Sequence, residues 1–238
     1  MHYKLIRSTS FFLTEPEEGK SFAVGHIAFA YLSGKGSARL LKTGLNIPLI
    51  ATLAVIPDVD ILFHGLIEHR GPTHSIITAL IIFAPFFALY RRAAFPYFVA
   101  LVQHSLVGDY LAGGRIQLFW PITTQYFGFT MEITSLTNVA IEWTMFLASI
   151  ALLFRTKDVA LFFQPHLSSL ILAIPTFTVL LPPILSFPLD VPILLIPPHV
   201  AYAIMFLAAI LLALSQVFRP RRDGNSDVTF KNEQESAS

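Results

Sequence analysis

Long apolar stretches separated by short polar segments dominate the chain. Six stretches reach the length that a membrane-spanning helix needs, about 17–25 residues. They cover residues 46–67, 73–90, 94–112, 138–154, 167–187 and 193–218. The pattern therefore predicts six crossings. A seventh stretch, Phe22–Leu32, is too short to span alone, so it is expected to be a buried, re-entrant or interfacial helix, or the visible part of a longer span.

Composition supports a membrane protein built from helices. Of the 238 residues, 54% are hydrophobic and 13% are charged, with a mean hydropathy of +0.64, whereas soluble domains carry about 25% charged residues. The expected fold class is all-α, a polytopic helical membrane protein with about six transmembrane helices and a short N-terminal buried or re-entrant helix. Membrane lipid is the expected partner, and the sequence leaves the oligomeric state open.

Charge and cysteine content narrow the function. A net charge of +1 excludes the strongly basic surface typical of a nucleic-acid-binding protein. The chain has no cysteine, so any metal must be held by nitrogen and oxygen. Basic residues flank alternate apolar stretches, which by the positive-inside rule places those loops and the C-terminus in the cytoplasm. The polar islands described below then lie toward the extracytoplasmic side.

Four segments are expected along the chain. A polar N-terminal segment covers 1–21, a membrane-embedded region with the candidate metal site covers 22–121, a helical membrane region covers 122–218, and a disordered cytoplasmic tail covers 219–238. Prolines recur between 175 and 198 and should interrupt the last two membrane helices, since proline breaks the helical hydrogen-bond pattern. We expect this half to serve in packing and as a possible lid.

Four polar islands interrupt the apolar sequence of the first half. Ionisable side chains are costly to bury in a membrane, so a cluster of them indicates a functional site. Histidine and aspartate are also the residue types that bind divalent metals such as zinc. The islands are Gly25-His26, Pro57–Asp60, His69–Ser75 and His104–Asp109.

The second island places two carboxylates close together in sequence. Asp58 and Asp60 would point about 200° apart on a continuous α-helix. Pro57 favours a break or a new helix start, which would let both contribute to one site. Alternatively, Asp58 caps a half-helix and Asp60 pairs with a histidine in a purely structural role.

The third island combines a turn with two histidines. Pro72 suits the first position of a helix, so His74 should lie in the first turn of the 73–90 helix, while His69 lies just before the turn. Both imidazoles can point to one place across a tight loop. Arg70 offers a planar guanidinium suited to phosphate or carboxylate, and the amides at the helix start favour the same anions. The alternative is an interfacial anchor or a solvated loop.

The fourth island needs a distorted helix to act as one site. His104 and Asp109 are five residues apart, about 140° around an ideal helix, and Gly108 can supply the distortion. His26 alone is more typical of a satisfied core residue, so its candidacy depends on the other islands.

Taken in order, the islands, with Leu118–Pro121 after them, resemble the YdjM-like family of membrane-bound proteins described as metal-dependent hydrolases. The resemblance covers about residues 22–121. It implies a multi-pass membrane protein with a His/Asp metal site and hydrolase activity. The positions that match are His26, Asp58, Asp60, His69, His74, His104 and Asp109.

We therefore hypothesise a hydrolase in which water activated by a divalent metal, most plausibly zinc, attacks an ester or phosphoester, possibly of a lipid. Asp60 and Arg70 are the candidate catalytic residues, with Asp60 or Asp58 acting as general base or orienting a histidine. The candidate metal ligands are His26, Asp58, His69, His74, His104 and Asp109. Two alternatives stay open: a transporter or ion-conducting protein that uses the same groups, and a nonenzymatic membrane scaffold.

Overall fold

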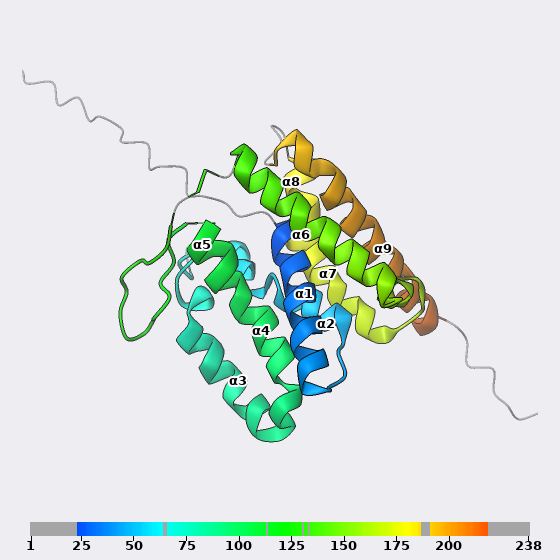
Figure 1. Ribbon diagram of the computed structural model, residues 1–238, viewed down its shortest axis with the longest axis horizontal. Helices are drawn as coiled ribbons and strands as arrows, with labels where there is room; N and C mark the ends of the chain where they lie inside the picture. Colours follow the sequence, from blue (N-terminus) through cyan, green and yellow to red (C-terminus); the bar gives the residue numbers. More distant parts are fainter. Residues whose placement is uncertain are drawn as a thin grey trace, which may run out of the picture.

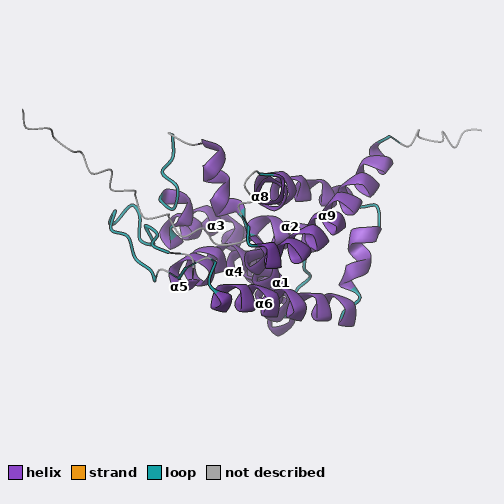
Figure 2. Cartoon of the chain, turned by 90° about the horizontal axis from the view of Figure 1, so that it is seen from above, coloured by secondary structure: helices purple, strands orange, loops and turns teal. Residues whose placement is uncertain are grey.

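The protein is all-α throughout the residues that the structure describes. These are 23–63, 66–112, 114–129, 131–132, 134–186 and 191–218 of the computed structural model. Helices account for about three quarters of them, and within these ranges the only bridge between extended segments joins Ile116 to Phe127 (Figure 2). The expected polar N-terminal segment and the expected disordered tail lie outside the described residues.

The α-helices are α1 (Ala23–Leu41), α2 (Ile47–Leu53), α3 (Ile76–Tyr90), α4 (Phe95–Gln103), α5 (Tyr110–Ala112), α6 (Leu136–Arg155), α7 (Ala173–Pro175), α8 (Leu181–Leu185) and α9 (Ile196–Val217). Short 3-10 helices lie between them: η1 (Ile56–Phe63), η2 (Pro72–His74), η3 (Arg91–Ala93), η5 (Asp158–Phe163), η6 (Leu167–Leu172) and η8 (Ile193–Leu195). Two segments are π-helical, η4 (His104–Asp109) and η7 (Thr176–Leu180).

Helix α1 forms the centre of the molecule. It packs along α4 and α6 and against α2 (Figure 1), and Val24, Ala28 and Ala30 are fully buried. Small side chains of this kind let neighbouring membrane helices approach closely. The described part of the short stretch, residues 23–32, is thus the first part of a longer helix, and this helix carries His26 into the interior.

Four helical segments, rather than six, are long and apolar enough to cross a membrane in the described part of the chain. They are Ile76–Ala93, Leu136–Arg155, Leu167–Leu185 and Ile193–Val217. The stretch 46–67 does not form a single long helix, because α2 ends at Leu53 and η1 follows around Pro57. The stretch 94–112 is helical without a break from Phe95 to Ala112, with the π-helical η4 inside it, but it is not among the segments long and apolar enough to cross a membrane. The second island thus lies where the first of these stretches is interrupted, and the fourth lies within the second.

The prolines act differently in the two last segments. Leu167–Leu185 is divided into η6, α7, η7 and α8, as proline interruption predicts. In contrast, α9 runs unbroken for 22 residues. Pro197 and Pro198 lie in its first turn, where the missing amide hydrogen would have had no partner within the helix.

A buried carboxylate on α6 holds the N-terminal end of α1. The Gly25 amide donates to Glu142 Oε2 over 2.6 Å, and the Glu142 side chain is buried. First-turn amides have no partner inside their own helix. A Cβ added at Gly25 would contact the Glu142 carboxylate, so the glycine permits this close approach.

Replacement of Glu142 with alanine is expected to lower stability by about 1–3 kcal/mol, because the buried Gly25 amide loses its acceptor. Glu142→Gln keeps an acceptor oxygen and should lose less. Thermal unfolding of both variants in detergent measures the difference. Equal losses would show that the carboxylate's charge, rather than the hydrogen bond, is what matters.

A second polar contact ties the other end of α1 to η5. Lys35 Nζ lies 2.5 Å from Asp158 Oδ2, and the Tyr31 hydroxyl donates to the same oxygen over 2.7 Å. Burial raises the pKa of Asp158, but the hydrogen bonds from Lys35 and Tyr31 outweigh it and hold the pKa below its usual value. This carboxylate is therefore ionised and already paired.

Candidate metal centre

Three short non-α segments bring the candidate ligands together. Asp58 comes from η1, His74 from η2, and His104 and Asp109 from the π-helical η4. His74, His104 and Asp109 are almost completely buried, and the Asp58 side chain is 15% exposed. The site therefore lies inside the protein and opens toward the surface at Asp58.

Four side-chain atoms of these residues surround one point. His74 Nε2 lies 3.4 Å from both Asp58 Oδ1 and Asp109 Oδ2. His104 Nε2 lies 3.3 Å from the same Asp58 oxygen and 3.2 Å from the same Asp109 oxygen. Two imidazole nitrogens and two carboxylate oxygens thus alternate around a small closed cluster.

The four nitrogen–oxygen distances fit neighbouring ligands of one metal ion. Ligands at about 2.0–2.1 Å from a zinc ion lie about 3.3–3.4 Å from one another at the corners of a tetrahedron, and the four distances, 3.2–3.4 Å, are close to this. His104 Nε2 and Asp109 Oδ2 are also buried without a hydrogen-bond partner of good geometry despite their proximity, although buried polar atoms are normally satisfied. A coordinated cation would satisfy both atoms.

The charges fit a divalent cation. Two carboxylates with two neutral imidazoles carry a total charge of −2, which one divalent ion neutralises. Burial lowers the pKa of His74, but the carboxylates of Asp58 and Asp60 outweigh it and raise the pKa above its usual value. The electrostatic field at the centre therefore favours positive charge.

The π-helix explains how His104 and Asp109 reach the same point. Residues five apart diverge on an α-helix, but the wider turn of a π-helix brings them toward one face. The Tyr110 amide donates to the Ser105 carbonyl, a hydrogen bond across five residues. The distortion expected around Gly108 is therefore present, and π-helical turns are common at functional sites.

The two imidazoles are oriented through their other nitrogens. His104 Nδ1 donates to the Ala54 carbonyl over 2.7 Å, which leaves Nε2 as the lone-pair nitrogen facing Asp58 and Asp109. His74 Nδ1 lies 3.0 Å from Thr73 Oγ1 and 3.4 Å from Asp60 Oδ2. Histidine ligands of metals are typically fixed in this way by a carbonyl or a carboxylate.

Asp60 lies behind His74, on the side away from Asp58. Its Oδ1 accepts from His69 Nδ1 over 2.8 Å, and its Oδ2 accepts from the Thr73 hydroxyl over 2.6 Å. Burial raises the pKa of Asp60, but hydrogen bonds from His69, His74 and Thr73 outweigh it and lower the pKa below its usual value. Asp60 is ionised, and both its oxygens are already engaged.

His26 and His69 lie at the edges of the cluster. The His26 ring stacks on His104 with 3.9 Å between ring centroids, and one His26 nitrogen lies within 4.8 Å of donor atoms of Asp58 and His104. His69 has the same relation to Asp58 and His74. Its side chain is 23% exposed, more than that of any other histidine in the cluster, so it borders the opening.

Arg70 sits next to the cluster without entering it. Its Nη2 lies 3.6 Å from Asp109 Oδ1, the carboxylate oxygen that faces away from His104, and its carbonyl accepts from the Gln117 amide. The guanidinium is therefore close enough to balance the charge of Asp109.

The start of α3 differs from the sequence-based expectation. His74 belongs to the separate turn η2, and α3 begins at Ile76 with Ser75 as its cap. Ser75 Oγ accepts from the amides of Ile77 and Thr78. These amides are already satisfied, so the expectation of an anion site there is wrong. A serine directly before an apolar run is a typical cap signal.

Two contributors were missed by sequence reasoning. Thr73 was part of the third island but had no assigned role, and its hydroxyl joins Asp60 to His74. Gly108 was expected only to distort the helix, yet a Cβ there would overlap the His26 ring. Neither contact has a local sequence signal, because each depends on a residue from another element.

Gly108→Ala is expected to lower the free energy of unfolding by about 1–3 kcal/mol, since His26 must move out of its place beside His104. Gly36→Ala is the matched control, because a Cβ at Gly36 meets nothing within 4 Å. In the helix α1, alanine is preferred over glycine by about 1 kcal/mol, so this variant should be as stable as the wild type or more so. Thermal unfolding of both variants tests the contact.

A family model for the YdjM inner membrane protein matches residues 22–181. The chain belongs to this family. No curated protein and no solved structure matches the sequence. The YdjM match includes every candidate site residue, and it extends beyond the resemblance at 22–121 to include α6 and the segment through η7. This YdjM family member is thus an inner membrane protein with a buried His/Asp cluster able to hold a metal ion.

Proposed function

We propose that this protein is a zinc-dependent hydrolase that cleaves an ester or phosphoester of a membrane amphiphile. The observation that carries the proposal is the cluster of two imidazole nitrogens and two carboxylate oxygens at distances typical of neighbouring metal ligands. Asp58, His74, His104 and Asp109 would hold the ion, and a further coordination position would have to stay open for water, because zinc that activates water needs a position free of protein ligands. Nitrogen and oxygen donors of this kind suit zinc, and less selectively manganese or iron.

A bound zinc ion supplies Lewis acidity, which polarises the substrate and acidifies water. The protein residues then have separate tasks. Asp60 orients His74 and His69 through the hydrogen bonds described above. His69, at the exposed edge and held at Nδ1 by Asp60, takes the proton released by the attacking water. Arg70 balances the negative charge of Asp109 and attracts an anionic group of the substrate.

The position of the site beside a membrane-spanning segment supports a membrane substrate. The cluster lies next to the start of α3, an apolar helix of membrane-spanning length. Asp58 and His69, whose side chains are partly exposed, lie at the edge of the cluster. Basic residues at Arg91 and Arg92 follow the other end of α3. By the positive-inside rule that end is cytoplasmic, so the site faces the extracytoplasmic side.

Metal removal tests the proposal directly. Elemental mass spectrometry of the detergent-purified protein should find about one zinc per chain, the stoichiometry of a single four-ligand site. Treatment with a chelator should abolish hydrolysis of phosphoester and ester lipid analogues, and added zinc should restore it. A purified, folded protein without metal, or turnover that resists complete metal removal, would contradict the proposal.

A further inference from the structure

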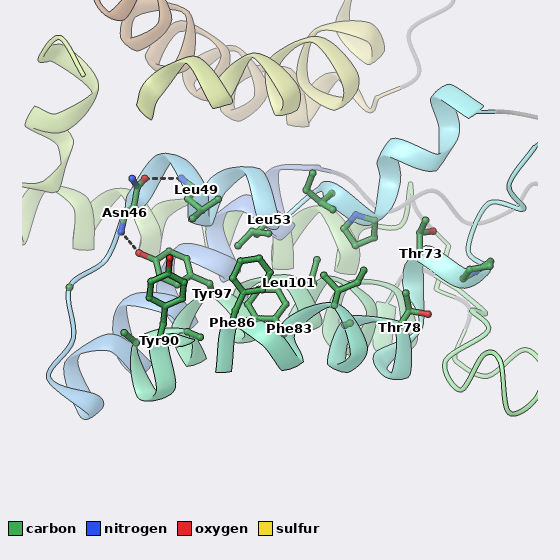
Figure 3. A pocket seen from close by; sticks show the side chains of 18 of the residues that line it. Asn46, Leu49, Leu53, Thr73, Thr78, Phe83, Phe86, Tyr90, Tyr97 and Leu101 are labelled. Atoms are coloured by element: carbon green, nitrogen blue, oxygen red, sulfur yellow. Dashed lines mark hydrogen bonds between the residues drawn. The ribbon is translucent and has the colours of Figure 1, made fainter. Parts of the chain in front are cut away.

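A large apolar groove lies beside the metal centre. It runs between α2 and η1 on one side and α3 and α4 on the other, with a volume of about 1010 Å³. Side chains such as Leu53, Phe83 and Leu101 line it (Figure 3). The volume is at the upper end of the range for small-molecule sites, about 300–1,000 Å³.

One end of the groove meets the candidate site. Pro57 and Thr73 both line it; Pro57 directly precedes Asp58, and Thr73 donates its hydroxyl to Asp60. Asn46, Tyr90 and Tyr97 surround the opposite end, where the Asn46 amide donates to the Tyr97 hydroxyl over 2.8 Å (Figure 3). The apolar groove therefore extends from residues next to the metal centre to a polar far end.

The groove has the length and position of a lipid chain. From Thr78 to Tyr90, α3 rises about 18 Å at 1.5 Å per residue, and one leaflet of the bilayer core is about 15 Å thick. Only 11% of the membrane-spanning segment Ile76–Ala93 is buried inside the protein. Ile82 and Phe86, which line the groove, are 52% and 45% exposed. The groove is thus open toward the lipid rather than closed within the bundle.

We propose that the groove binds one acyl chain of a membrane phospholipid and thereby places the headgroup ester or phosphoester at the metal centre. This inference rests on the proposed hydrolase function for its headgroup half. The donor groups support the orientation, because the His/Asp cluster that could hold a metal lies at one end of the groove only. Tyr90 and Tyr97 at the other end then limit the length of chain that fits.

Photolabelling of the full-length protein in bilayer nanodiscs tests the groove without requiring activity. The probe is a phosphatidylglycerol with a diazirine near the end of one acyl chain, and labelled residues are mapped by mass spectrometry. Leu53, which is partly buried on α2 and lines the groove, should be labelled. Ile82→Trp fills the groove and should reduce this labelling about tenfold, a loss of about 1.4 kcal/mol in affinity.

Ile81→Trp is the matched control. Ile81 precedes Ile82 on α3, is 63% exposed and does not line the groove, so its replacement should leave Leu53 labelling unchanged. Phe86→Trp provides a second, smaller obstruction should Ile82→Trp unfold. An equal loss in Ile81→Trp and Ile82→Trp would overturn the proposal, as would labelling confined to outward positions such as Leu89.

The outcomes separate the groove from the hydrolase. Labelling of Leu53 in a protein that holds no metal and shows no turnover would support lipid binding in the groove and contradict the proposed hydrolase function. Zinc-dependent turnover without labelling of Leu53 would contradict lipid binding in the groove and leave the hydrolase function standing. In His104→Ala, labelling should persist while turnover is lost, because the groove does not depend on that imidazole.

Discussion

Replacing His104 with alanine is expected to remove the bound metal and to reduce hydrolytic turnover by about a thousandfold. Its Nε2 is one of the four donors, and its Nδ1 is fixed by the Ala54 carbonyl, so the substitution removes an oriented ligand. Metal ions stabilise hydrolytic transition states by several kcal/mol, and about 4 kcal/mol corresponds to a factor of about a thousand. Zinc content and turnover of a lipid phosphoester analogue are measured on the same preparation.

His199→Ala is the matched control for that experiment. His199 is also completely buried, but it lies in α9, and its Nδ1 donates to the Leu195 carbonyl over 2.8 Å. The same substitution there removes a buried imidazole without touching the cluster. We expect His199→Ala to keep its zinc even where its thermal stability falls. Normal zinc content and turnover in a folded His104→Ala protein would contradict the proposed ligand role.

The candidate site could be predicted largely because its residues are unusual for their surroundings. Aspartates and histidines in apolar sequence are costly, so their positions stand out. The need for a distorted helix between His104 and Asp109 followed from simple geometry, and the π-helix meets it. Sequence could not show that His74 lies between Asp58 and Asp60, one carboxylate on each ring nitrogen, because this arrangement depends on how η1 and η2 pack.

The number of membrane crossings was harder to predict, for a related physical reason. The stretch 46–67 is apolar, but hydrogen bonding of the backbone decides whether a helix continues, and α2 ends at Leu53, before Pro57. In 94–112 the helix continues through the π-helical η4, and the polar residues of the fourth island lower its hydropathy. The polar islands that revealed the site thus also account for the smaller number of membrane spans. The groove beside α3 could not be predicted from the sequence. Apolar residues that line a groove cannot be distinguished, in the sequence, from apolar residues that face lipid.

Engagement of both Asp60 oxygens favours a positioning role over that of a general base. Its oxygens accept from His69 and Thr73, and Oδ2 also faces His74 Nδ1. A general base must have a free oxygen directed at the reacting water. Asp58 lies closer to the opening, but its carboxylate belongs to the cluster of metal donors. In the proposed hydrolase, His69 would then take the proton on its other nitrogen, because its Nδ1 is engaged by Asp60.

Asp60→Asn is therefore expected to weaken zinc binding by about 10- to 100-fold, the effect typical of losing a carboxylate that orients a histidine ligand. The amide has the same shape but lacks the charge, and only one of its two polar atoms is an acceptor. His74 then loses its electrostatic support at Nδ1, and its Nε2 becomes a poorer donor to the metal. Competition with a chelator of known affinity measures the change in zinc affinity.

Asp158→Asn is the control for this change. Asp158 is likewise an ionised carboxylate paired with a cation and a hydroxyl, Lys35 and Tyr31, but it lies at the opposite end of α1. The substitution should lower thermal stability slightly and leave zinc affinity unchanged. Equal zinc affinity in Asp60→Asn and wild type would show that Thr73 alone orients His74. A complete loss of zinc in folded Asp60→Asn would instead indicate that Asp60 is itself a ligand, because loss of an orienting group weakens a metal site without abolishing it.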